Sequence, residues 1–186
     1  MTDNKAKTPD NNMTVSPSPD YALVQKSIGN ALRSSGVTYP IDAKNLAEIH
    51  GLTVTFSQFP ESYKSKVNGI LDFVNARIFV NADIPTEYQN FAIAHELGHW
   101  LMHKEKQKEY NDYSIMLMFS EGVQEYPNAE MSVMEKEANL FATNLLAPLQ
   151  MIMNYKAMGV PNKSISKALL VPEEIISKVF NGLYNR

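Results

Sequence analysis

Residues 90–103 read NFAIAHELGHWLMH and contain two histidines four positions apart. On a helix, this spacing places the imidazoles of His95 and His99 on one face, about one turn apart. Two imidazole nitrogens placed in this way can bind one zinc ion. Glu96 lies roughly 100° around the helix from His95, where its carboxylate can accept a proton from a water molecule beside the metal. The stretch therefore predicts a metal-binding helix with Glu96 as the general base.

The alternative is an ordinary core helix in which two histidines share this spacing by chance. The other side of the helix is apolar as well, because it carries Ile93, Leu97 and Leu101. A helix that is buried on most sides is costly to form with two histidines and a glutamate inside it, unless these side chains bind a ligand. The composition of the helix therefore favours the metal site.

A third metal ligand is expected outside this stretch. The chain contains no cysteine, and no histidine follows His103, so a downstream carboxylate is expected. Residues 135–148 read EKEANLFATNLLAP and offer Glu135 and Glu137. On a helical wheel, Glu135 falls at one side of the apolar stripe, and Glu137 falls just outside its other side. The wheel favours Glu135 but leaves Glu137 open, and Glu135 also completes a capping box, S-x-x-E, with Ser132.

The remaining sequence alternates helical patterns with a few short strands. Periodicity, glycines and prolines predict helices at residues 21–35, 43–50, 85–103, 132–147, 163–170 and 172–180. Strand patterns occupy residues 52–56, 69–73 and 77–81, and the last two predict a β-hairpin. In that hairpin, Ile78 and Val80 are predicted to lie on one face and Phe79 on the other. The pattern predicts helices around a short β-sheet.

Composition limits the classes of function. The 186 residues carry a net charge of −3 without a long basic stretch, so no direct contact with nucleic acid is expected. Residues 1–19 are rich in Asn, Asp, Thr, Ser and Pro, and they predict a disordered tail rather than a signal peptide. No apolar run reaches membrane-spanning length. We expect a soluble cytoplasmic protein with one domain at residues 20–150 and a helical segment at 151–186, which packs on the domain or binds a partner.

Three stretches, NGILDFVNARIFVN (68–81), NFAIAHELGHWLMH (90–103) and EKEANLFATNLLAP (135–148), resemble in order the core of the ImmA/IrrE family of metallopeptidases. The resemblance covers about residues 22–150, and its specific parts are AHELGHxxxH and ExxAxxFAxxLLxP. The stretch between His99 and Glu135 shows no match.

The resemblance implies a small α+β, zincin-like and gluzincin-like fold. It implies that Glu135, together with His95 and His99, holds Zn²⁺, and that Glu96 is catalytic. It further implies a zinc-dependent endopeptidase that cleaves a specific helix-turn-helix repressor, and so derepresses a mobile element or a stress operon. The alternative function is a non-proteolytic, metal-stabilised antirepressor or antitoxin-type binding module. Glu96 favours the enzyme, because a purely structural metal site needs no carboxylate at that position.

A few further residues carry weaker expectations. His103 is predicted as a surface or helix-end histidine, with a role behind the metal ligands as the alternative. Tyr110 and Tyr113 are candidates for stabilising an oxyanion. The apolar patch at residues 113–119 is predicted to belong to the core, with an edge that receives an extended peptide as the alternative.

Overall fold

The structure, a computed structural model, describes residues 18–107, 115–119 and 129–182. The helices of this part are α1 (Tyr21–Ser35), α2 (Ala43–Ile49), α3 (Glu61–Lys64), α4 (Thr86–Gln107), α5 (Ala129–Leu146), α6 (Leu149–Ala157), α7 (Asn162–Leu169) and α8 (Glu173–Phe180). The strands are β1 (Thr53–Ser57), β2 (Val67–Asp72), β3 (Arg77–Asn81) and β4 (Ile115–Phe119). The fold is therefore α+β, as predicted.

The four strands form one mixed sheet in the order β1-β3-β2-β4. Strands β2 and β3 pair antiparallel, which confirms the predicted hairpin, and β1 runs parallel to β3. Strand β4 pairs antiparallel with β2 at the edge of the sheet. Ile78 and Val80 are fully buried while Phe79 is only partly buried, as the alternation in the sequence predicts.

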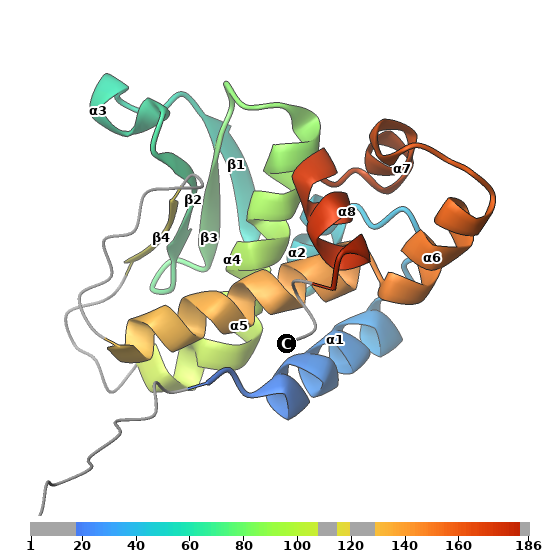
Figure 1. Ribbon diagram of the computed structural model, residues 1–186. Coiled ribbons are helices and arrows are strands. Elements are labelled where there is room, and N and C mark those ends of the chain that lie inside the picture. Colours follow the sequence, from blue (N-terminus) through green and yellow to red (C-terminus); the bar gives the residue numbers. More distant parts are fainter. Residues whose placement is uncertain (1–17, 108–114, 120–128, 183–186) are drawn as a thin grey trace, which may run out of the picture.

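Helices α4 and α5 pack closely against each other, and α4 also packs against β2 of the sheet (Figure 1). Helix α4 is thus held between the sheet and α5, and this explains why it is apolar on more than one side. Helix α1 lies on α5, and α2 lies on α4. The C-terminal helices α6, α7 and α8 pack on one another at one end of the molecule. The core consists mainly of aliphatic side chains and Phe141, which is fully buried.

Capping groups and one buried amide fix the helices around α4. The side chain of Asp20 accepts a hydrogen bond from the Leu23 amide at the start of α1, and Gly36 ends that helix with a positive φ of 65°. Within α4, the buried Asn90 side chain accepts a hydrogen bond from the Ala43 amide and donates to the carbonyls of Ile41 and Leu170. The amide of Asn90 thus ties α4 to the start of α2 and the end of α7.

Several expectations need correction. Helix α5 is already formed at Ala129, so Ser132 lies inside the helix and is not its N-cap, and the capping box is wrong. The sequence patterns did not predict α3 or α6. Of the patch at 113–119, residues 115–119 form β4, whereas residues 113–114 lie outside the described part of the chain. No helix among the described residues is both long and apolar enough to cross a membrane.

Candidate metal centre

Three buried side chains meet where α4 faces α5. His95 and His99 project from α4, and Glu135 projects from α5. The Nε2 atom of His95 lies 3.2 Å from one carboxylate oxygen of Glu135, and Nε2 of His99 lies 3.2 Å from the other. The two Nε2 atoms are 3.1 Å apart. Two imidazole nitrogens and a carboxylate oxygen therefore point at one another from two helices.

This arrangement fits a divalent metal such as zinc. One potential ligand atom from each of the three residues lies within 4.8 Å of the others. Two ligands that are each about 2.0–2.1 Å from a tetrahedral zinc ion lie roughly 3.3 Å apart, which is close to the observed separations. Nitrogen from histidine and oxygen from glutamate are also ligands that catalytic zinc sites use, with one position left for water or substrate. His95, His99 and Glu135 could therefore hold a metal ion.

Burial and neighbouring side chains set the protonation states of His99 and Glu135. Desolvation lowers the pKa of His99 to about 4, which outweighs the opposing effect of Glu135. His99 is therefore neutral at pH 7, as a metal ligand must be. Burial by itself would raise the pKa of Glu135, but the adjacent imidazoles of His99 and His95 outweigh it and hold the pKa below its ordinary value. The carboxylate is therefore ionised, as ligation requires.

Gly98 and Phe141 determine how closely the two helices approach at this site. A Cβ atom on Gly98 would lie 3.0 Å from Cδ1 of Phe141 and 3.2 Å from its Cβ and Cγ. The buried Ala138 and Ala142 add little bulk between the helices. This close approach accompanies the 3.2 Å distances from Glu135 to both histidines.

Glu96 lies fully buried on α4, next to His95 in sequence and against β2 in space. A Cβ atom on Gly69 of β2 would come within 3.1 Å of Oε1 of Glu96 and within 3.3 Å of its Cγ. The missing side chain at residue 69 therefore leaves the space that the carboxylate occupies. The sequence predicted Glu96 as the base but did not identify Gly69 as the residue that makes room for it.

A second group of polar side chains lies behind the three candidate ligands. Nδ1 of His95 is 3.1 Å from Oδ1 of Asn139. Nδ1 of His99 is 3.0 Å from Nδ1 of His103, and Nε2 of His103 is 2.8 Å from Oε2 of Glu137. His103 is 0% exposed and Glu137 is 2% exposed. The expectation of a surface histidine at position 103 was therefore wrong. Glu137, which the helical wheel placed just outside the apolar stripe of α5, is buried as well.

Helical spacing could have identified part of this group. His103 follows His99 by four residues, and Asn139 follows Glu135 by four, so each lies one turn further along the same helix face. The spacing did not reveal that Glu137 reaches across to α4. Tyr110 and Tyr113, the candidates for an oxyanion contact, lie outside the described residues.

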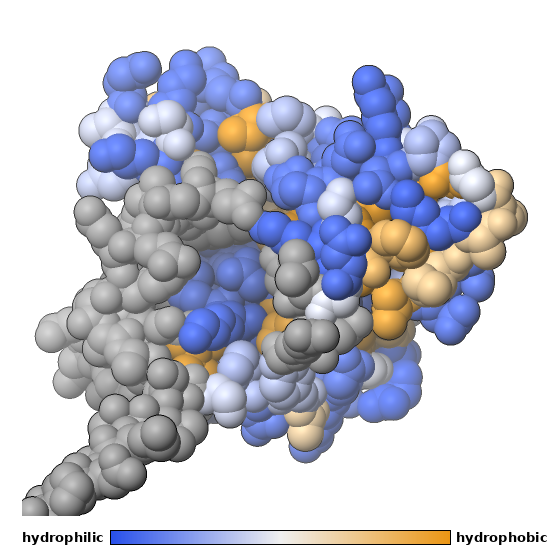
Figure 2. Space-filling view, in the orientation of Figure 1, coloured by the Kyte–Doolittle hydropathy of each residue, from blue (hydrophilic) through white to orange (hydrophobic). Residues whose placement is uncertain are grey.

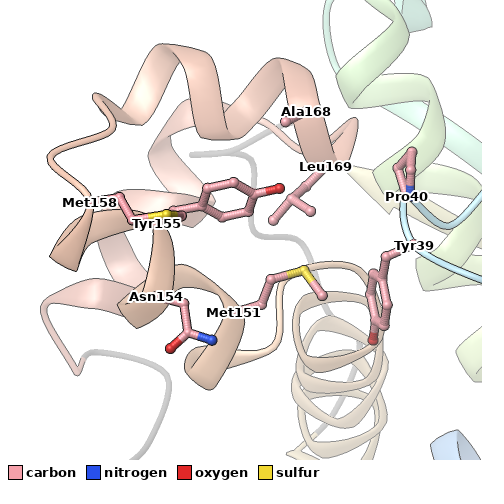
Figure 3. Close-up of a pocket in the computed structure, with 8 residues that line it drawn as sticks. All are labelled: Tyr39, Pro40, Met151, Asn154, Tyr155, Met158, Ala168 and Leu169. Carbon is pink, nitrogen blue, oxygen red and sulfur yellow. The ribbon is translucent and has the colours of Figure 1, made fainter.

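A separate pocket of about 410 Å³ lies among the C-terminal helices (Figure 3). It is lined by Tyr39, Pro40, Met151, Asn154, Tyr155, Met158, Ala168 and Leu169. The Tyr39 hydroxyl donates a hydrogen bond to the Leu145 carbonyl near the end of α5, ten residues or roughly 15 Å along the helix from Glu135. No carboxylate, imidazole or thiol lines this pocket, and its ionisable groups are the hydroxyls of Tyr39 and Tyr155.

The exposed apolar side chains near this pocket belong mainly to α6 and α8. Figure 2 shows hydrophobic atoms gathered over the C-terminal helices, whereas much of the remaining visible surface is hydrophilic. The large exposed side chains of this region are Leu149, Met153, Met158 and Phe180. The catalytically capable groups and the exposed apolar groups therefore occupy different parts of the molecule.

Comparison with known proteins agrees with the α+β fold and shows a peptidase family. A solved structure titled Mycobacterium tuberculosis transcriptional regulator superposes with a TM-score of 0.57 at 15% sequence identity, over 85% of this chain and 46% of that chain. This likeness concerns the fold, and the present chain spans less than half the length of that regulator. No curated protein gives a significant match. The family model Peptidase_M78, described as the IrrE N-terminal-like domain, matches residues 47–184. These residues include α4, α5 and the whole His–His–Glu group. The chain therefore belongs to this peptidase family.

Proposed function

We propose that the protein is a zinc-dependent endopeptidase in which His95, His99 and Glu135 hold the metal and Glu96 is the general base. The observation that carries the proposal is the convergence of two buried imidazoles and one carboxylate on a single point, in a chain that belongs to a peptidase family. A bound zinc ion would supply Lewis acidity, which lowers the pKa of a water molecule and polarises a carbonyl group.

Glu96 supplies the proton transfer in this proposal. Its carboxylate takes a proton from the water molecule as the water oxygen attacks the carbonyl carbon of the peptide bond. The same group then delivers the proton to the leaving nitrogen as the C–N bond breaks. Glu96 is fully buried, so little bulk water competes for its carboxylate. Gly69 leaves room for this carboxylate to stay in place through both transfers.

Strand β4 provides a surface for an extended substrate. It is the edge strand of the sheet, and its partner among the described strands is β2. An extended peptide can add to such an edge through main-chain hydrogen bonds. Helix α4 contacts both β2 and β4, so a peptide on this edge would run beside the helix that carries His95 and His99. This placement supports an endopeptidase, which needs substrate on both sides of the scissile bond.

We further propose that the substrate is a helix-turn-helix repressor, cleaved in the cytoplasm at one site. The support is the resemblance to the ImmA/IrrE family together with the physical need for narrow specificity in a peptidase that acts among cellular proteins. Such specificity requires contacts beyond the scissile bond. Little activity on casein or on short generic peptides is therefore expected.

Glu96→Gln tests the proposed role of the base. Glutamine keeps the size of the side chain but cannot accept the proton, so cleavage of the repressor encoded beside the gene should fall by about 10²–10⁴-fold. Zinc content and melting temperature should remain near those of the wild type. Glu105→Gln, on an exposed residue of the same helix, is the matched control and should cleave normally. Equal cleavage by Glu96→Gln would refute the assignment, and an uncut but tightly bound repressor would favour the binding-module alternative.

A further inference from the structure

Behind His99, a buried line of hydrogen-bonding groups runs from α4 to the beginning of α1. It passes from Nδ1 of His99 to Nδ1 of His103 at 3.0 Å, and from Nε2 of His103 to Oε2 of Glu137 at 2.8 Å. The other oxygen of Glu137 accepts a hydrogen bond of 2.8 Å from the backbone N–H of Asp20. Both His103 and Glu137 are almost completely inaccessible to solvent.

With Glu137 ionised and each histidine carrying one ring proton, the ends of this line determine the direction of every hydrogen bond in it. The Asp20 backbone can only donate, and an ionised Glu137 can only accept, so Glu137 must receive hydrogen bonds at both oxygens. His103 then carries its proton on Nε2, and its Nδ1 is left as an acceptor. His99 must therefore carry its proton on Nδ1. The Nε2 atom of His99, which faces Glu135, is consequently left with a free lone pair.

We propose that His103 and Glu137 are positioning residues that hold His99 in the tautomer and ring orientation needed to bind a metal. Neither residue would be a ligand itself. Hydrogen bonds of this kind, in which a metal-binding histidine donates its second ring N–H to a carboxylate, are known to fix the tautomer of the histidine and to raise the metal affinity. Here the Glu137 carboxylate acts on His99 through the imidazole of His103. The inference rests on the proposed metal site but not on peptidase activity.

His95, the other candidate histidine ligand, is held in the same tautomer as His99. Nδ1 of His95 faces the amide oxygen of Asn139 at 3.1 Å, so this imidazole too is held with its proton on Nδ1 and its Nε2 free. Both histidines are therefore presented to the metal through the same atom. Glu135, Glu137 and Asn139 come from alternate positions of α5, so this one helix provides a ligand and the terminal acceptors behind both histidines.

Glu137→Gln tests this inference because glutamine cannot replace both functions of the carboxylate. Its amide has one acceptor and one donor group, whereas the site presents two donors. If the amide oxygen faces Asp20, the amide nitrogen donates to His103, and the proton pattern of both histidines is reversed. Nε2 of His99 would then carry a proton that the metal must displace. We expect the zinc affinity to fall by about 10–100-fold.

The experiment measures zinc affinity by competition with a chromophoric chelator, in the full chain and without any activity assay. Lys136→Gln, at an exposed position of the same helix, is the control and should bind zinc as the wild type does. Equal affinity of Glu137→Gln and wild type would overturn the inference alone. Failure of the wild-type protein to bind zinc would overturn both the inference and the proposed metal site.

A spectroscopic readout on the wild type keeps the test independent of whether the variant folds. The chain has four histidines, so ¹⁵N–¹H correlation spectra of the imidazoles can be assigned individually. In the zinc-loaded protein, His103 should show the tautomer protonated at Nε2, and His99 the tautomer protonated at Nδ1. In Glu137→Gln, the His103 signals should change while those of the distant His50 do not. A wild-type His103 that is protonated at Nδ1 instead would refute the assignment.

Discussion

Gly98→Ala perturbs a point where α4 and α5 approach closely, and the structure gives the size of the resulting overlap. The new Cβ atom would lie 3.0 Å from Cδ1 of Phe141, which falls 0.4 Å short of the 3.4 Å at which ordinary contact begins. Phe141 is fully buried and cannot swing into solvent. The helices must therefore separate by a few tenths of an ångström, or Phe141 must leave its preferred rotamer.

Two opposing effects set the change in the free energy of unfolding. Replacing a glycine inside a helix by alanine stabilises the fold by about 1 kcal/mol through helix propensity. Overpacking a core contact costs about 1–3 kcal/mol. The net expectation for Gly98→Ala is a loss of about 0–2 kcal/mol, which lowers the melting temperature by up to about 8 °C in a chain of this size.

Gly29→Ala in α1 is the matched control, because its Cβ atom would meet only the flexible Arg33 side chain at 3.6 Å. This variant should gain about 1 kcal/mol. Urea denaturation of both variants in the presence of chelator gives the two free energies of unfolding without a contribution from metal. Zinc affinity should fall only for Gly98→Ala, because Glu135 moves away from the histidines with α5. Equal stabilisation by both variants, with unchanged zinc affinity, would refute the close-packing argument.

Three further outcomes are expected. Gly69→Ala should displace the Glu96 carboxylate and lower kcat while zinc content stays unchanged, and an unaffected kcat would show that the space at residue 69 is unimportant. Glu135→Ala should lose most bound zinc in metal analysis of the purified protein, because it removes one of three candidate ligands, whereas retention of zinc would move the ligand elsewhere. Deletion of residues 1–18 should change the melting temperature by less than about 2 °C, since the predicted tail is polar and the capping groups of Asp20 remain; a larger drop would indicate that the tail is docked.

The local elements of the fold could be predicted from the sequence because their signals are local. Apolar periodicity and Pro85 predicted α4 within a few residues, and the alternation around residues 74–76 predicted the hairpin. The parallel pairing of β1 with β3 was not predicted, because it joins strands that are separated in the sequence and depends on how the chain crosses over. The four-residue α3 is too short to show a periodicity. Helix α6 is no shorter than the predicted α7, but it carries apolar side chains on its exposed side, among them Leu149 and Met153, so no clear apolar stripe marks it.

The candidate site, like the fold, could be predicted only where its signals are local in the sequence. The four-residue spacing placed His95 and His99 on one face, and the apolar stripe of α5 favoured Glu135 over Glu137. A helical wheel shows which residues share a face but not what lies opposite them. It therefore could not show that Glu137 meets His103 across the interface. The capping box failed for a related reason, because a local match does not determine where the helix begins.

The most direct test of the proposed activity is mass spectrometry of a helix-turn-helix repressor, the proposed substrate, after incubation with the zinc-loaded protein. The account predicts cleavage at one site, with two fragments whose combined mass exceeds that of the intact repressor by one water molecule. Cleavage should stop when a chelator removes the metal that His95, His99 and Glu135 are proposed to hold, and it should resume when zinc is added back. An intact repressor, or cleavage that continues after the metal has been removed, would contradict the account.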